Sequence, residues 1–214
     1  MEKIIFHKET KTFHLYNEEI SYIMCVLENG HMGQLYYGKR IHDKPDFSYL
    51  VEKCGRPMTS YIFEGDRSFS LEHIRQEYPV YGTTDYRHPA IEIMQENGSN
   101  ISEFQYVGYE ILKGKPSLKG LPATYTESEE EAETLKIILK DSLTGAKLTL
   151  LYTIFSKGSA IARSAHICNE GEKVLHLQTM MSLNLDLPDK DYVWMQLSGA
   201  WSRERYVKNR ILEQ

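Results

Sequence analysis

Residues 134–155 read TLKIILKDSLTGAKLTLLYTIF, and this stretch decides the fold class. Apolar side chains recur at every second position in 134–139 and again through much of 147–155, on either side of a Leu-Thr-Gly turn at 143–145. The pattern predicts two strands joined by a short turn, because side chains at successive strand positions point to opposite faces. One face of each strand is then available for a core, as is typical of an antiparallel sheet.

The same alternation recurs along the rest of the chain. It predicts further strands at residues 11–16, 20–27, 32–37, 90–95, 104–112, 161–169 and 174–187. Asn97-Gly98 follows one of them and is a strong hairpin signal, because both residues tolerate positive φ. Short turns rather than strand–helix–strand units join the strands, so we expect an all-β fold, an antiparallel two-sheet β-sandwich.

Two segments leave the secondary structure open. Residues 129–136, EEEAETLK, contain helix formers and could begin a helix. The alternation of Leu135, Ile137 and Leu139 favours a charged loop that enters a strand instead. Residues 40–69 show no clean period, and irregular segments of this length inside a compact domain are usually functional or mobile.

Composition excludes several classes of function. The 214 residues carry a formal net charge of −5, which offers no footprint for nucleic acid or an anionic membrane. The first residues are too briefly apolar for a signal peptide, and no run is long enough to span a bilayer. The three cysteines are widely spaced and fit reduced thiols in the cytoplasm, which is the expected location.

No catalytic constellation can be recognised from the residues alone. Glycoside hydrolysis by the usual route needs two carboxylates that face each other across the glycosidic bond. The acidic groups here are a charge run at 129–131 and the turn positions Asp186, Asp189 and Asp191, and no pair among them can be given acid and nucleophile roles. The eight histidines lack metal-ligand spacing, and nucleotide-binding motifs are absent. We therefore expect no catalytic residue, metal ion or cofactor within these residues.

Two aromatic clusters stand out in a chain with 15 tyrosines and 7 phenylalanines. Residues 78–90 place three tyrosines, an acid and a base around Gly82. Residues 197–206, LSGAWSRERY, place Trp201 directly after two small residues. An indole at such a turn can offer a flat face to the apolar side of a sugar ring. Burial at a domain junction is the alternative for Trp201.

Several ordered motifs carry a resemblance that covers nearly the whole chain. The chain resembles the N-terminal region of bacterial family 36 α-galactosidases of the raffinose- and melibiose-hydrolysing type. The motifs are YYGK at 36–39, EYPVYGTTDYR at 77–87, KGKP at 113–116 with GLPATY at 120–125, EAETL at 131–135 and SGAWSRER at 198–205.

The resemblance implies a two-sheet β-supersandwich of the galactose mutarotase-like type, followed by a (β/α)8 barrel and a small C-terminal β domain. In the family the barrel carries the two catalytic aspartates of a retaining mechanism, and neither motif is found before Gln214. Residues 1–214 are therefore expected to be the N-terminal portion of the enzyme, cut within the sandwich and inactive alone.

The resemblance also implies two substrate contacts. In the family this region supports homo-oligomers, commonly tetramers, and helps to close the pocket that binds galactose in α-galactoside oligosaccharides. The tryptophan of the Gly-Ala-Trp motif matches Trp201. A second contact, an aspartate after the Tyr-Gly-Lys motif, falls on Val51 or Glu52, where the chain departs from the family. Glu52 is the residue that could supply the carboxylate.

Two other functions remain open. A free-standing carbohydrate-binding β-sandwich module would also use tyrosine and tryptophan platforms. The sandwich of another glycosidase or of a sugar epimerase is the third possibility, because fold alone does not fix function. The sequence downstream of Gln214 separates the three.

Overall fold

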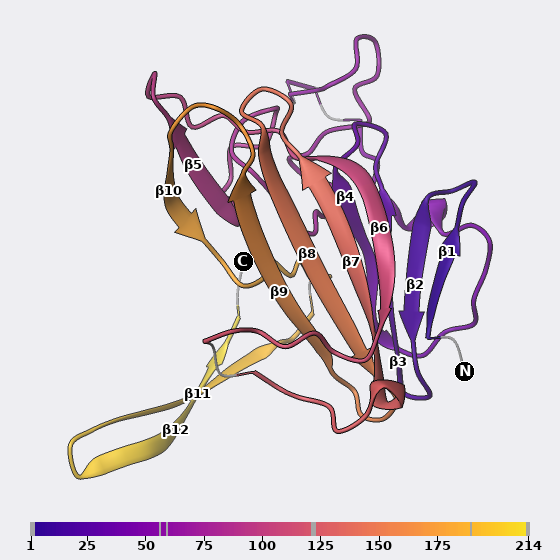
Figure 1. The fold of residues 1–214 in the computed structure, drawn as a ribbon, viewed down its shortest axis with the longest axis vertical. Coiled ribbons are helices and arrows are strands. Elements are labelled where there is room, and N and C mark those ends of the chain that lie inside the picture. The colour runs from indigo at the N-terminus through magenta and orange to yellow at the C-terminus, as the bar shows by residue number, and fades with distance from the viewer. Residues whose placement is uncertain (1–2, 56, 59, 121–122, 189, 213–214) are drawn as a thin grey trace.

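The computed structural model describes residues 3–55, 57–58, 60–120, 123–188 and 190–212, which are almost entirely strands and loops (Figure 1). Within those residues the only helices are two short 3-10 turns, η1 (Ser48–Leu50) and η2 (Glu129–Glu131). No helix among them is long and apolar enough to cross a membrane. The strands are β1 (Ile4–His7), β2 (Thr12–Tyr16), β3 (Ile20–Val26), β4 (Met32–Lys39), β5 (Ile91–Gln95), β6 (Gln105–Lys113), β7 (Ala132–Lys140), β8 (Ala146–Phe155), β9 (Ile161–Asn169), β10 (Leu175–Met180), β11 (Val193–Ala200) and β12 (Arg203–Ile211).

Two four-stranded antiparallel sheets form the body of the molecule (Figure 1). The first sheet has the order β1-β2-β3-β4 and the second has the order β6-β7-β8-β9. Strands that follow one another in the chain are thus neighbours in space, as expected when short turns join them. The predicted antiparallel two-sheet sandwich is confirmed. Four further strands form two pairs, β5 with β10 and β11 with β12.

The main core lies between the two sheets. The alternating apolar residues of β7 and β8 point into it, and Leu135, Ile137, Leu148 and Tyr152 are completely buried there. They pack in the same cluster as side chains of β1 to β4 and of β5. The period of two that predicted these strands therefore records one buried face on each strand.

A second core covers the opposite face of the first sheet. Ile23, Cys25 and Leu35 of that face pack with Phe47 and with Phe69, Leu71 and Ile74. The irregular segment between β4 and β5 is therefore anchored by buried apolar side chains. It follows that β3 is buried on both faces, which explains its nearly continuous apolar sequence.

The structure corrects some predicted boundaries. The strand predicted at 174–187 is wrong beyond Met180, because residues 181–187 bond to loops and side chains rather than to another strand. Residues 129–136 form the turn η2 and then enter β7, so the strand interpretation is confirmed over the helix. Strands β1, β11 and β12 were not predicted. Of the predicted motifs, Leu121, Pro122 and Asp189 lie outside the described residues.

Candidate functional site

The hairpin of β11 and β12 carries the Gly-Ala-Trp motif and projects from the body (Figure 1). Cross-strand partners share a face of such a hairpin. The register pairs Val193 with Ile211 and Leu197 with Val207, which gives one apolar face that also includes Met195. All five of these side chains are exposed. The projecting hairpin thus presents an uncovered apolar surface.

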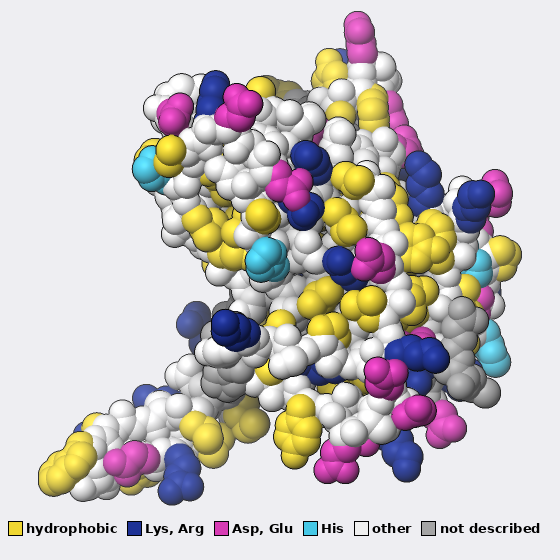
Figure 2. Space-filling view, viewed as in Figure 1, with side chains coloured by type: hydrophobic (Ala, Val, Ile, Leu, Met, Phe, Trp, Pro, Cys, Tyr) yellow, Lys and Arg dark blue, Asp and Glu magenta, His cyan; other side chains and the backbone are white. Residues whose placement is uncertain are grey.

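The other face of the hairpin is polar, cationic and aromatic. The register pairs Trp194 with Arg210, Gln196 with Lys208 and Ser198 with Tyr206. A shallow pocket with a volume of 490 Å³ lies on the hairpin. Its lining residues are Ser198, Gly199, Ala200, Arg203, Tyr206 and Lys208. Figure 2 shows hydrophobic side chains and cationic ones side by side on this projection. The hairpin is therefore two-faced: one face is apolar except for Asn209, the partner of Met195, and the cationic and aromatic groups named here lie on the other.

Trp201 lies in the turn of this hairpin and is 92% exposed. The glycine two positions before it, Gly199, has a structural cause. A Cβ atom on Gly199 would lie 2.0 Å from the carbonyl oxygen of Arg203. The two strands of the hairpin therefore approach too closely here for any residue other than glycine. Ser202 adopts a φ of 62°, which reverses the chain beside the indole. Within this chain Trp201 is not buried.

The second predicted contact, Glu52, lies in the irregular segment just after η1. Val51 is half-buried and packs against the second core, whereas Glu52 is exposed. Of the two positions, only Glu52 therefore has its side chain directed to solvent. In Figure 1 the purple segment that contains it lies at the upper right, away from the hairpin at the lower left. One chain does not bring Trp201 and Glu52 together.

The glutamate at the start of the motif at 77–87 belongs to a buried scaffold. The Glu77 carboxylate is completely buried and accepts hydrogen bonds from the hydroxyls of Tyr22 and Tyr152, both at 2.8 Å. Arg163 pairs with the same carboxylate at 3.0 Å. Burial raises the pKa of Glu77, while Arg163 and the two hydroxyls oppose that rise. A carboxylate sealed in this way has no access to a substrate.

The acid and the base of the aromatic cluster at residues 78–90 form an ion pair. Nε of Arg87 lies 2.9 Å from the Asp85 carboxylate, which also accepts from Gln76 at 2.7 Å. Tyr81 and Tyr86 remain at the surface and pack edge-to-face, with ring centroids 5.6 Å apart. The residues around the glycine turn therefore hold one another in place.

The structure also assembles three residues in an order that resembles a nucleophilic triad. Nε2 of His14 lies 2.9 Å from the Ser21 hydroxyl, and its Nδ1 lies 2.7 Å from Asp43. Ser21 is completely buried, however, and its hydroxyl oxygen already accepts the backbone N–H of Ile41. The arrangement fastens a loop and cannot attack a substrate. The sequence did not suggest it, because the three residues show no motif spacing.

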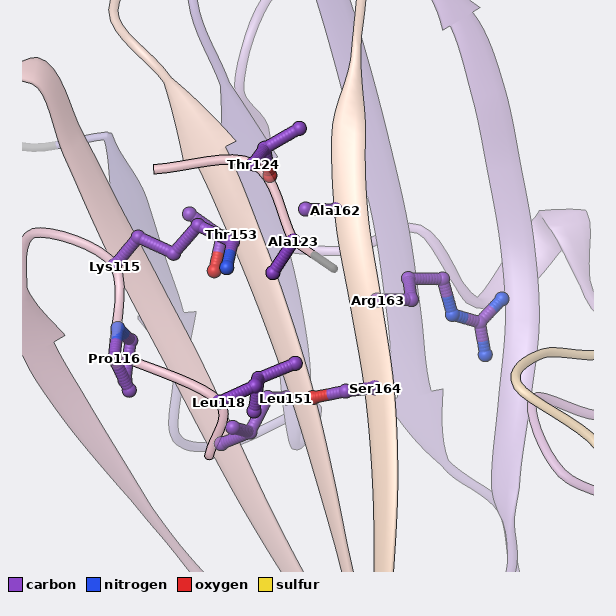
Figure 3. Close-up of a pocket in the computed structure, with 10 residues that line it drawn as sticks. All are labelled: Lys115, Pro116, Leu118, Ala123, Thr124, Leu151, Thr153, Ala162, Arg163 and Ser164. Carbon is purple, nitrogen blue, oxygen red and sulfur yellow. The ribbon is translucent and has the colours of Figure 1, made fainter. Parts of the chain in front are cut away.

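A pocket of 190 Å³ lies between β8 and β9 on one side and the loop residues Lys115, Pro116, Leu118, Ala123 and Thr124 on the other (Figure 3). Its polar lining includes Lys115, Thr124 and Ser164, while Arg163 points away from the loop. The hydroxyl of Thr153 is already paired with Thr134 at 2.7 Å. The described lining has no aromatic ring and no carboxylate. The described lining thus lacks an aromatic ring that could stack on a sugar and a carboxylate that could hydrolyse one.

Other acidic and metal-ligating groups do not form a reactive cluster in the described part of the chain. Glu129 to Glu131 are exposed in η2, and Asp186 is spaced from them in a different segment. No group of three His, Cys, Asp or Glu side chains among the described residues is arranged to hold a metal ion. The hairpin with Trp201 is the feature whose exposed apolar and aromatic side chains can contact another molecule.

Comparison with known proteins gives strong matches along the chain. Residues 30–214 match the sequence profile described as the glycosyl hydrolase family 36 N-terminal domain. The chain is 42% identical over 209 residues to α-galactosidase AgaA of Geobacillus stearothermophilus, covering 98% of this chain and 28% of that protein. The crystal structure of an α-galactosidase from Lactobacillus brevis superposes with a TM-score of 0.94 at 38% identity, covering 98% of this chain and 28% of that one.

A structure with a bound sugar is also similar. A variant of AgaA crystallised in complex with raffinose superposes with a TM-score of 0.89 at 42% identity, covering 95% of this chain and 28% of that one. The chain thus spans little more than a quarter of the length of these relatives.

Proposed function

This chain belongs to the glycosyl hydrolase family 36 N-terminal domain family, and we propose that it is the non-catalytic N-terminal part of an α-galactosidase. The parent enzyme would release terminal α-D-galactosyl residues from melibiose- and raffinose-type galactosides. The observation that carries this proposal is the match of 98% of the chain to 28% of α-galactosidase AgaA. A relative bound to raffinose supports the substrate class.

The hairpin suits a role in assembly and in closing the galactose pocket. Its apolar face, with Leu197 and Val207, is left uncovered in the chain and fits a protein partner such as another copy. Trp201 at its tip would form one wall of the galactose site, with Glu52 as a second contact. Because the segments that carry them lie apart, an oligomer would let different copies supply them to one site.

The compartment we propose is the cytoplasm. Cys25, Cys54 and Cys168 are all free thiols in the structure. Unpaired cysteines are the common state where thiol-reducing systems operate.

Hydrolysis of a nitrophenyl α-galactoside tests the proposal. The full-length protein should turn it over, and residues 1–214 alone should not, because binding residues cannot replace the two carboxylates that stabilise the transition state. Turnover by the rigorously purified chain would contradict the non-catalytic role. A stop codon directly after Gln214 in the gene would favour the free-standing carbohydrate-binding module instead.

A further inference from the structure

The segment between β10 and the hairpin begins with residues 181–187, a strap that has two different sides. Asn184 and Asp186 are half-buried, while Leu183, Leu185 and Leu187 are 37–45% exposed. The strap is the only covalent route from β10 into β11. Whatever holds the strap therefore fixes the point from which the hairpin departs.

Four hydrogen bonds fasten the strap to the body. They join the Tyr78 hydroxyl to Met181 O at 2.5 Å, Met181 N to Ala90 O at 2.8 Å, Asn184 Nδ2 to Gln76 O at 2.9 Å and Asp186 N to Gln34 Oε1 at 3.1 Å. Three of the partners belong to residues 76–90, which include the buried scaffold around Glu77. The stretch at residues 76–90, which holds no open site, thus anchors the strap.

Arg163 adds a fifth contact and connects the strap to the buried carboxylate. Its Nη1 donates to the backbone oxygen of Asn184 at 2.7 Å, and its Nη2 lies 3.0 Å from the carboxylate of Glu77. Both side chains of this ion pair are almost fully buried. A buried ion pair contributes little net stability, and its better-attested use is to fix one arrangement among several. Here the arrangement fixed is the path of the strap.

We infer that Arg163 is a positioning residue for the galactose site, because it holds the strap that leads to the Trp201 hairpin. This inference rests on the proposed role of Trp201 in the full-length enzyme. Among the described residues of this stretch, Asp186 is the last one bonded to the body, seven positions before Val193, whereas Met181 is twelve positions before it. Without the contacts of Asn184, the bond from Asp186 N to Gln34 is the one described fastening left beyond Met181. Each time that bond opens, the free tether lengthens from seven to twelve residues and the volume that the hairpin can explore grows about twofold, because the reach of a flexible tether scales with the square root of its length.

Two substitutions loosen the strap from opposite sides. Arg163→Lys keeps a positive charge beside Glu77 but loses the planar fork that also reaches Asn184. Asn184→Ala removes the bond to Gln76 and leaves the Arg163–Glu77 pair in place, so the sandwich stays folded even if Arg163→Lys does not. Arg87→Lys is the matched control, because Arg87 also pairs with a buried carboxylate of the motif but makes no bond to the strap.

The first measurement is tryptophan fluorescence anisotropy decay of the 214-residue chain. Its only two tryptophans are Trp194 and Trp201, and both belong to the hairpin. We expect a larger amplitude of nanosecond motion in Arg163→Lys, in Asn184→Ala and most of all in the double variant, and no change in Arg87→Lys. Unchanged anisotropy in the folded strap variants overturns the inference.

The second measurement separates positioning from plain loss of structure in the full-length enzyme. Fewer molecules with a competent hairpin should raise KM about two- to fivefold while kcat is kept. A merely structural defect instead lowers kcat per mole of total protein at constant KM. If Trp201→Ala lowers kcat/KM but the double variant keeps an unchanged KM, the inference about Arg163 is overturned. Normal kinetics of Trp201→Ala itself overturn the proposed function, and anisotropy then still reports whether Arg163 holds the strap.

Discussion

Nδ1 of His14 lies 2.7 Å from Oδ1 of Asp43, and Nε2 of His7 lies 2.9 Å from the same oxygen. The two histidines come from β2 and β1, whereas Asp43 belongs to the irregular segment that contains Glu52. The other nitrogen of His14 contacts Ser21, whose hydroxyl accepts the N–H of Ile41. One buried imidazole therefore fastens the beginning of this segment to the first sheet.

Acidification should weaken this fastening. Burial lowers the pKa of His14 from 6.5; Asp43 opposes the shift, while His7 and Arg40 add to it. His14 is therefore protonated more readily in the unfolded chain than in the folded one. The free energy of unfolding falls as the pH drops below about 6.5. Burial raises the pKa of Asp43, but its bonds to the two histidines lower it overall, so a second loss follows below 3.8.

Urea unfolding between pH 7.5 and 4.5 measures this effect. His14→Gln should flatten the dependence by at most about 1.4 kcal/mol per pH unit, the limit for one proton. His88→Gln, at an exposed position, should leave the slope unchanged. Parallel profiles for His14→Gln and the unsubstituted chain would show that His14 is not responsible.

Gly145 lies where the β7–β8 turn touches the β9–β10 turn. Its φ is 75°, and a Cβ there would lie 2.8 Å from the Cα of Gly171. Gly145→Ala should cost about 2–4 kcal/mol, of which about 1–2 is backbone strain and the rest overpacking. Gly158→Ala is the control, because φ is 91° but nothing lies within 4 Å, so only the strain remains. Equal shifts of the two urea midpoints would refute the close approach.

The apolar face of the hairpin should make the chain self-associate. We expect light scattering to show dimers or larger species, because uncovered apolar strands favour pairing. Leu197→Lys, on the apolar face, should lower the average mass. Gln196→Lys, the neighbouring residue on the polar face, should not. A dilution-stable monomer of the unsubstituted chain would count against this surface.

Every strand that the sequence predicted contributes side chains to a core. Burial imposes the alternation in β7 and β8, and their observed bounds differ from the predicted ones by at most two residues. No such constraint acts on β12, whose side chains are all exposed and largely charged, so it went unpredicted. Residues 181–187 alternate as a strand does because Asn184 and Asp186 face the body while the leucines between them face solvent, although the segment pairs with no strand.

Much of the site depends on contacts that no local pattern records. The motif led to Trp201, and the close approach of the two hairpin strands explains why Gly199 precedes it in the motif. Arg163 and Glu77 are 86 residues apart, and only the packing of the segment between β4 and β5 against the second sheet brings them together. His7 and His14 meet because β1 and β2 pair in a register that a single sequence does not reveal. Exposure supports Glu52 over Val51, and its contact with substrate stays a prediction.

Trp201→Ala tests the galactose pocket directly. Trp201 is 92% exposed in the chain, so its removal should leave the melting temperature of residues 1–214 unchanged. In the full-length enzyme kcat/KM should fall about 10- to 200-fold, on the order of 1.4–3 kcal/mol, the size of one aromatic contact in a desolvated site. Activity should not vanish, because no proton transfer or covalent bond depends on the indole.

A tryptophan buried at the junction between sandwich and barrel predicts the reverse. Its loss would cost the full-length enzyme about 3–5 kcal/mol of stability, as a large-to-small change in a core does, and kinetics would stay near normal in the folded fraction. Trp194→Ala is the internal control, since Trp194 is a half-exposed indole of the same hairpin away from the turn. Measuring kcat/KM and thermal stability on one preparation decides the matter, because a destabilised enzyme with normal kcat/KM excludes Trp201 from the pocket.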